Sequence, residues 1–313
     1  MPTAVAAPAT LPFAMDFGRP VTTAMPPARG AGLEFQIPLL AGSARELLFP
    51  AVRAHPSGTG LQLFTNGDLL LGCATEPVTE ESQLALQSQD LYRRVLTAAR
   101  GHHLYRIWNY IPRINALTDG FENYRAFCQG RSLAFEAEAG AGFPRVLPSA
   151  SGVGTADGCL SVIFVAGLAD PRHVENPEQI PAYRYPPEHG PRSPSFSRAT
   201  VVPLPNRTLA FISGTAAIKG HQSIAVDDLS GQLDCTLDNL RLISVASGLD
   251  ENLAANRKLQ RHFKIYLRHT ADLKAVQTRL ERSLLMPSDH VIYQQADICR
   301  AELTVEIEVT LIG

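Results

Sequence analysis

The chain has 313 residues, of which 45% are hydrophobic and 19% are charged, and its formal net charge at pH 7 is -2. This length can bury one large core or two domains. The near-neutral charge argues against a nucleic acid or an anionic membrane surface as a partner.

The cysteines and the N-terminus indicate a cytoplasmic protein. The five cysteines are widely spaced, without a CxxC or a Cys/His pair at zinc spacing. This favours reduced thiols over disulfides or a structural metal. The Ala/Pro-rich N-terminus lacks the basic cluster and apolar core of a signal peptide, and no apolar run approaches the ~20 residues of a membrane span.

Four segments are expected along the chain: a leader, two lobes and a connecting segment between the lobes. Residues 1–32, rich in Ala, Pro and Gly, predict a flexible leader. An N-terminal lobe is expected over 33–170, with strands at 61–64, 69–72, 104–111 and 160–165 and helices at 81–100 and 123–138. A C-terminal domain is expected over 207–313, with strands at 208–214, 263–268 and 303–311 and helices at 233–246 and from 270 onward.

Both halves thus follow the order strand, helix, strand, helix, strand, which suggests an old duplication. Such alternation predicts an α/β (α+β) fold, with two similar lobes of mixed β-sheet and helices packed on one face of each sheet.

The connecting segment, residues 171–206, is dense in proline and also carries Tyr183, Tyr185, Phe196 and Arg198. Long loops in compact domains are often lids or binding loops. We therefore expect an ordered loop over the site, although a disordered linker is the alternative.

The last strand contains a candidate functional carboxylate. Apolar Leu303, Val305 and Ile307 alternate with polar residues, so one face of this strand packs on a core. Glu306 lies on the other face, where it is either solvated or held in a cleft.

Several motifs resemble known families. The C-terminal part is similar to the RidA/YjgF group of small deaminases. The segments that carry this similarity are "FISGTAAI", "GQLDCTLDNLRLI", "FKIYLRHTADLKAVQTRL" and "LTVEIE". Over most of the chain beyond residue 32, the sequence resembles the chorismatases. The motifs that carry this resemblance are "RIWNYIPRIN" (106–115), "ENYRAFCQGR" (122–131), "ENPEQIPAYRYP" (175–186), "PSFSRA" (194–199), "ISGTAAIKGH" (212–221) and "ADICRAELTVEIE" (296–308).

The resemblance implies cleavage of chorismate to pyruvate and a ring acid, with Glu306 as the general acid that protonates the enolpyruvyl methylene. Gly214 in the "ISGT" turn and Cys299 before the final strand fit the branch that forms 3-hydroxybenzoate, with 4-hydroxybenzoate as a second aromatic product. Gly214 would leave room for the ring, and Cys299 would line the cavity, unless it is an inert buried thiol.

Chorismate carries two carboxylates, which planar arginines bind best. The candidates are Arg106, Arg113, Arg198 and Arg268, and we expect Arg106 and Arg268 to face one cleft because they belong to corresponding strands. Three tyrosines are candidate hydrogen-bond donors to a carboxylate, and their alternative role is local packing. These are Tyr110, Tyr124 and Tyr183.

Three other functions stay open. They are chorismate hydrolysis to a dihydroxycyclohexadiene carboxylate, RidA-type enamine/imine deamination, and non-catalytic sensing of a small acid. No metal or organic cofactor is expected, and a pigment, quinone or secondary-metabolite pathway would use the product. The chain is expected to be a monomer or, like the small RidA proteins, a homotrimer.

Overall fold

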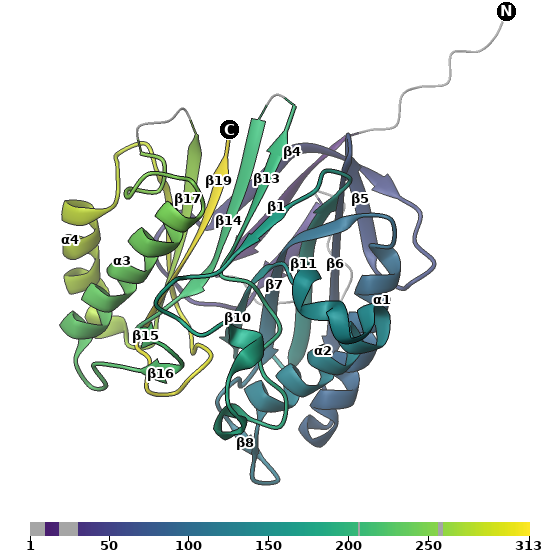
Figure 1. Cartoon of the computed structure of the whole chain (residues 1–313), viewed down its shortest axis with the longest axis horizontal. Helices are drawn as coiled ribbons and strands as arrows, with labels where there is room; N and C mark the ends of the chain where they lie inside the picture. Colours follow the sequence, from purple (N-terminus) through teal and green to yellow (C-terminus); the bar gives the residue numbers. More distant parts are fainter. Residues whose placement is uncertain (1–9, 19–30, 206, 256–258) are drawn as a thin grey trace, which may run out of the picture.

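The structure, a computed structural model, describes residues 10–18, 31–205, 207–255 and 259–313. Two β-sheets lie face to face in the middle of the molecule, and a pair of helices covers the outer face of each (Figure 1). The layers therefore follow the order helices, sheet, sheet, helices.

The first sheet has eight strands in the order β10-β7-β11-β6-β5-β4-β1-β2. Its strands are β1 (Leu11–Phe17), β2 (Ala31–Phe35), β4 (Arg45–His55), β5 (Gln62–Asn66), β6 (Leu69–Pro77), β7 (His103–Pro112), β10 (Ser149–Thr155) and β11 (Cys159–Gly167). Its helices are α1 (Leu84–Ala98) and α2 (Asn123–Ala139). Leu84, Leu91 and Val95 recur at helical spacing on α1 and are buried in the helix–sheet core with Phe127 and Phe135 of α2.

The second sheet has seven strands in the order β12-β13-β14-β19-β17-β18-β3. Its strands are β3 (Leu39–Gly42), β12 (Arg172–Val174), β13 (Ala199–Leu204), β14 (Arg207–Thr215), β17 (Gln260–Leu267), β18 (His290–Gln295) and β19 (Val305–Ile312). Its outer face packs on α3 (Leu229–Ala246) and α4 (Leu273–Ser283).

Short elements connect these layers. They are the hairpins β8 (Leu117–Thr118) with β9 (Phe121–Glu122) and β15 (Ile218–Lys219) with β16 (Gln222–Ser223), and the 3₁₀ turns η1 (Glu81–Gln83), η2 (Gly140–Val146), η3 (Ala182–Arg184), η4 (Pro187–His189) and η5 (Thr270–Asp272). Among the described residues, no helix is both long and apolar enough to cross a bilayer.

The two lobes repeat one topology. The order β10-β7-β11-β6 in the first sheet matches β18-β17-β19-β14 in the second, and β7–β10 and β17–β18 are the parallel pairs. The predicted fold of two similar mixed-sheet lobes with helices on one face is therefore confirmed. The other face of each sheet packs on the opposite lobe, where Phe13, Phe49, Trp108 and Phe211 belong to one shared core.

The leader prediction is wrong for part of residues 1–32, while residues 1–9 and 19–30 lie outside the described residues. Leu11–Phe17 forms β1, which pairs with β2 and β4. Phe13, Met15 and Phe17 are buried between the sheets, and this apolar burial offsets the entropy of ordering the segment.

The predicted segment boundaries also need correction. Strand β3 belongs to the range 33–170, yet it pairs with β18 at the edge of the second sheet. The connecting segment 171–206 is not a pure loop, because it contains β12 and β13 of that sheet. The N-terminal range therefore contributes a strand to the second sheet, while the first sheet contains only strands that precede residue 170.

Candidate active site

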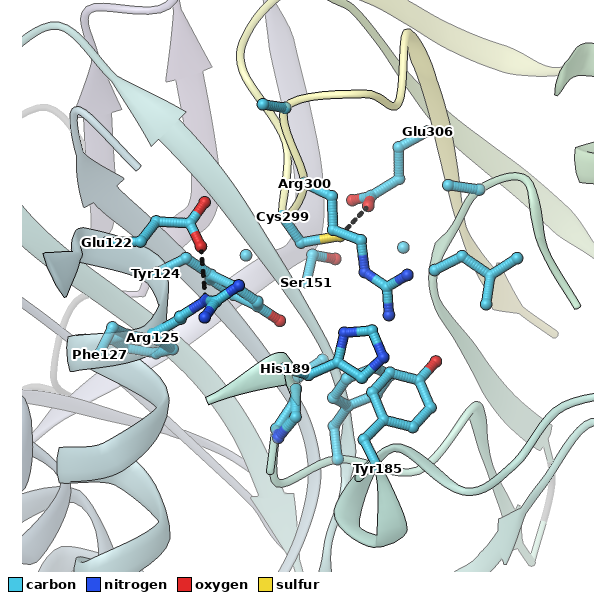
Figure 2. Close-up of a pocket in the computed structure, with 18 of the residues that line it drawn as sticks. Glu122, Tyr124, Arg125, Phe127, Ser151, Tyr185, His189, Cys299, Arg300 and Glu306 are labelled. Atoms are coloured by element: carbon cyan, nitrogen blue, oxygen red, sulfur yellow. Dashed lines mark hydrogen bonds and ion pairs between the residues drawn. The ribbon is translucent and has the colours of Figure 1, made fainter. Parts of the chain in front are cut away.

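A cavity of about 190 Å³ lies where the two lobes and the connecting segment meet. Helix α2 supplies Tyr124, Phe127 and Arg131, β10 supplies Ser151 and Gly152, and the connecting segment supplies Tyr185, His189, Phe196 and Arg198. The C-terminal lobe supplies Gly214, Cys299, Arg300 and Glu306. Figure 2 shows Cys299 and Arg300 next to Glu306, with Ser151, His189 and Tyr185 among the other side chains that line the cavity.

Glu306 is the buried acid of this cavity. Its strand β19 turns Val305, Ile307 and Val309 toward the helices α3 and α4, so the alternate residues face the first lobe. The side chain is 3% exposed. Burial, reinforced by the negative charge of Glu308, raises the pKa of Glu306 to about 8, although Arg106 and Arg198 oppose this rise. The group therefore carries a proton at neutral pH and can act as a general acid.

Glu308, two residues further along the same face, is held as a charged carboxylate. Its Oε2 lies 2.8 Å from Arg106 Nη2, and its Oε1 lies 2.7 Å from Lys264 Nζ and 2.8 Å from Trp108 Nε1. Ser151 also donates to it. Burial alone would raise the pKa of Glu308, but Lys264 and Arg106 together lower it below its usual value. The two neighbouring carboxyls thus have different charges.

Replacement of Glu308 by Gln is expected to lower the pKa of Glu306. The change removes a negative charge and leaves Arg106 without its carboxylate partner, while Lys264 Nζ keeps the carboxylate of Glu46 at 2.8 Å. We expect the alkaline limb of the pH–rate profile to move to lower pH by about one unit, as for loss of one close charge. A limb that stays in place in a folded variant would show that Glu308 does not set this pKa.

Gly214 makes room for the carboxyl group of Glu306. Between Ile212 and Thr215 the register of β14 against β19 shifts, which places Gly214 in a bulge. A Cβ atom at Gly214 would lie 2.1 Å from Glu306 Oε1. Glycine is therefore required here by the close approach of the acid.

The Gly214→Ala variant is expected to release pyruvate about tenfold more slowly, because the added methyl group displaces the acid from its productive position. Gly152→Ala is the matched control, since its Cβ would lie 3.3 Å from the ring of Tyr124 in the same cavity. The rates of both variants are measured by steady-state kinetics and compared with that of the wild-type protein. Equal rates for Gly214→Ala and wild type would contradict a need for this space.

Cys299 lies beside the acid, with its Sγ 3.9 Å from Glu306 Oε2 (Figure 2). Burial, assisted by Glu306, raises the pKa of this thiol well above its usual value. The thiol is therefore neutral and serves as a weak hydrogen-bond donor to the acid, not as a nucleophile. All five cysteines of the chain are free.

Of the residues predicted from the sequence, the structure brings Glu306, Cys299, Gly214, Arg198 and Tyr124 together at the cavity. Arg198 Nη2 donates to the hydroxyl of Tyr185 at 2.6 Å. Burial raises the pKa of Tyr124, so its phenol stays protonated as a donor.

Five other predicted site residues do not line this cavity. Arg106 lies outside the cavity and forms an ion pair with Glu308. Tyr110 lies in the core between the sheets, where its ring centroid is 3.8 Å from that of Phe35. The prediction that Arg106 and Arg268 face one cleft is wrong. β17 ends at Leu267, so Arg268 lies beyond the strand, where it donates to the carbonyl oxygens of Leu303 and Arg300.

The remaining two residues line separate surface hollows. Arg113 lines a hollow that Arg268 also lines, and Tyr183 lines another together with Arg184. Four of these residues lie in motifs that resemble the chorismatases, and Arg268 lies in one that resembles the RidA/YjgF group. The side chains of all five belong to the packing of the scaffold or line these hollows.

Arg131 is a cavity residue that the sequence interpretation missed. It is 3% exposed, and its Nε and Nη2 have no hydrogen-bond partner among the described residues. Its guanidinium lies over the ring of Tyr92 at 5.1 Å. Tyr124, Phe127 and Arg131 follow at positions i, i+3 and i+7 of α2, and this helical spacing was the signal that would have placed them on one face.

The chain is similar to several known proteins. The model of the family described as "Chorismatase FkbO/Hyg5-like, N-terminal" matches residues 50–166. A 3-hydroxybenzoate synthase of Streptomyces hygroscopicus is 37% identical over 216 residues, which are 66% of this chain and 62% of that protein. The chain thus spans less than two thirds of that relative.

A chorismatase of Streptomyces rapamycinicus is 35% identical over 77% of this chain and 74% of its own length. The crystal structure of a chorismatase covers 100% of this chain and 96% of that chain with a TM-score of 0.82 at 27% identity. A YjgF-family structure from Neisseria meningitidis covers 46% of this chain and 96% of its own, with a TM-score of 0.31 at 18% identity. On its similarity to the chorismatases, this chain belongs to the chorismatase family.

Proposed function

We propose that this protein cleaves chorismate into pyruvate and 3-hydroxybenzoate. The observation that carries the proposal is a buried, protonated Glu306 in a cavity that also contains unpaired arginine N–H groups. Relatives named 3-hydroxybenzoate synthase and chorismatase support the same substrate.

The arginines hold the substrate. Arg131 on α2, Arg198 near the end of the connecting segment and Arg300 before β19 all line the cavity. Chorismate has two carboxylates, and each forms short charge-assisted hydrogen bonds with a guanidinium. In the proposed complex, the enolpyruvyl ether lies beside the carboxyl group of Glu306, which lines the same cavity as the arginines.

Glu306 then gives its proton to the terminal methylene of the enolpyruvyl group. The double bond electrons form the new C–H bond, and positive charge develops at the ether carbon as an oxocarbenium centre. The Glu306 carboxylate that remains stabilises this charge across a site from which water is largely excluded. The charged Glu308 network behind it does not supply a proton, since its carboxylate is already ionised.

The ring hydroxyl next to the ether-bearing ring carbon attacks that carbon as the bond to pyruvate breaks, and its proton returns to the Glu306 carboxylate. The resulting epoxide opens at the C–O bond to the carbon that first carried the hydroxyl. The oxygen takes up a proton while the ring carbon that now bears it loses one, which gives the aromatic ring.

The atoms of chorismate then equal those of pyruvate plus 3-hydroxybenzoate, so this reaction consumes no water. Formation of the dihydroxycyclohexadiene carboxylate consumes one water molecule. The close approach of the Glu306 carboxyl group to Gly214 and to the Cys299 thiol supports the aromatic product, because such packing leaves little room beside the acid for an attacking water molecule.

The test is to incubate the purified protein with chorismate and identify the ring acid by chromatography against authentic standards. Pyruvate with 3-hydroxybenzoate is the expected result. Pyruvate with the dihydroxycyclohexadiene carboxylate would keep the chorismate cleavage but overturn the product assignment. No pyruvate would overturn the proposed function and return attention to enamine substrates or ligand sensing.

A further inference from the structure

Two histidines and a glutamate meet at the rim of the cavity. Glu188 and His189 are the last residues of η4 in the connecting segment, and His221 lies in the turn between β15 and β16 of the C-terminal lobe. The side chain of His189 is 20% exposed and that of His221 is 23% exposed. All three offer donor atoms that lie within 4.8 Å of one another.

The donor atoms have the separations of ligands around one small ion. His189 Nε2 lies 3.0 Å from His221 Nδ1, and Glu188 Oε1 lies 3.6 Å from the former and 3.4 Å from the latter. Ligands about 2.05 Å from a tetrahedral Zn²⁺ are about 3.3 Å apart. The three separations lie on either side of this value, so an ion fits with small side-chain adjustments.

The backbone holds the two segments of this cluster together. Gly220, next to His221, donates to the carbonyl oxygen of Glu178 at 2.9 Å and accepts from Ile180 N–H at 2.9 Å. The histidines therefore do not have to be brought together by the ion, which lowers the entropy loss on binding.

We propose that Glu188, His189 and His221 form a binding site for one divalent transition-metal ion, with Zn²⁺ or Co²⁺ as the best-matched occupant. Two imidazoles and one carboxylate favour these ions over Mg²⁺ or Ca²⁺, which prefer oxygen ligands only. The fourth position of the ion is open to water or to an anion in the cavity, as in sites with three protein ligands.

An aromatic ring and a carboxylate border the histidine pair. The ring of Tyr185 packs beside both histidines, at 5.1 Å from His189 and 6.3 Å from His221. The carboxylate of Glu188 offsets part of the charge of an incoming ion.

An ion at this site changes the cavity. Because His189 lines the cavity, a bound ion adds positive charge at its rim and ties the connecting segment to the β15–β16 turn. The inference concerns this metal site alone and does not depend on which substrate the protein cleaves.

The experiment is a titration of the chelator-treated, full-length protein with Co²⁺ at neutral pH, followed by visible absorption. We expect a saturable band at one equivalent that Zn²⁺ removes, and a rise in Tm with Zn²⁺. His221→Ala should abolish the band, and Glu188→Gln, a conservative change of an exposed side chain, should weaken binding about tenfold or more, a loss typical of changes around a metal. His269→Ala, an exposed histidine elsewhere, is the matched control and should bind as wild type does.

Three results would overturn the proposal. One is the lack of any saturable band in the wild-type protein. The second is a band of equal strength in folded His221→Ala and Glu188→Gln. The third is a sulfur-to-cobalt charge-transfer band that disappears in Cys299→Ser, which would move the metal to the thiol.

Discussion

The Glu306→Gln variant is expected to release pyruvate from chorismate about 10³-fold more slowly than the wild-type protein, within the range that a general acid contributes. Gln has nearly the shape of a protonated Glu, so the packing against Gly214 and Cys299 is retained. It has no acidic proton to give to the methylene carbon. The measurement is a coupled assay of pyruvate under steady-state and single-turnover conditions.

Glu302→Gln is the matched control for this prediction. Glu302 also borders the cavity, but it is exposed and accepts a hydrogen bond from Ser223 at 2.7 Å. Its replacement should leave the rate within about twofold, as for surface changes. If Glu306→Gln kept more than a tenth of the wild-type rate, another group would have to protonate the substrate.

The Arg131→Met variant is expected to raise the KM for chorismate about 10²-fold, because the variant loses a bidentate pair with a substrate carboxylate. Each charged hydrogen bond of such a pair contributes roughly 1.5–3 kcal/mol. Met fills much of the space next to Tyr92 and Phe135, on which the guanidinium now packs. Arg131→Lys should restore little, since an ammonium cannot form the planar pair. The KM and kcat are measured separately by steady-state kinetics.

Arg113→Met tests whether the effect is specific to the cavity. Arg113 belongs to a motif that resembles the family, yet it lines a separate surface hollow. Its replacement should leave the KM unchanged. A similar rise in KM for both variants, or none for Arg131→Met, would contradict the assignment of Arg131 as a carboxylate ligand.

Much of the fold is predictable from local patterns. The period-two alternation of β19, the helical spacing in α1 and the order of elements in each half predicted two lobes of one topology, which the strand orders confirm. β1 was missed because its seven residues lie in an Ala/Pro-rich region and become ordered only between strands that come later in the chain. β18 pairs in parallel with β17, and such long-range pairing leaves little local signal.

The site was predictable only in part, and the reason is the packing of one sheet on the other. The alternation of β19 showed that Glu306 and Glu308 share a face, but not that the face lies against the opposite lobe. Arg106 and Lys264 occupy corresponding positions of β7 and β17, and this duplication brings both cations to Glu308. The alternation of a strand does not show whether an inward-facing arginine such as Arg106 pairs with a buried carboxylate or lines the cavity.

The most direct test of the account is the pH dependence of kcat/KM for pyruvate release by the wild-type protein. A general acid must be protonated, and the pKa of Glu306 is raised to about 8. We therefore expect a plateau near neutral pH and a tenfold fall per pH unit above about 8, in the region of that pKa. A rate that rises through pH 8, or an alkaline limb that is unchanged in the residual activity of Glu306→Gln, would contradict Glu306 as the proton donor.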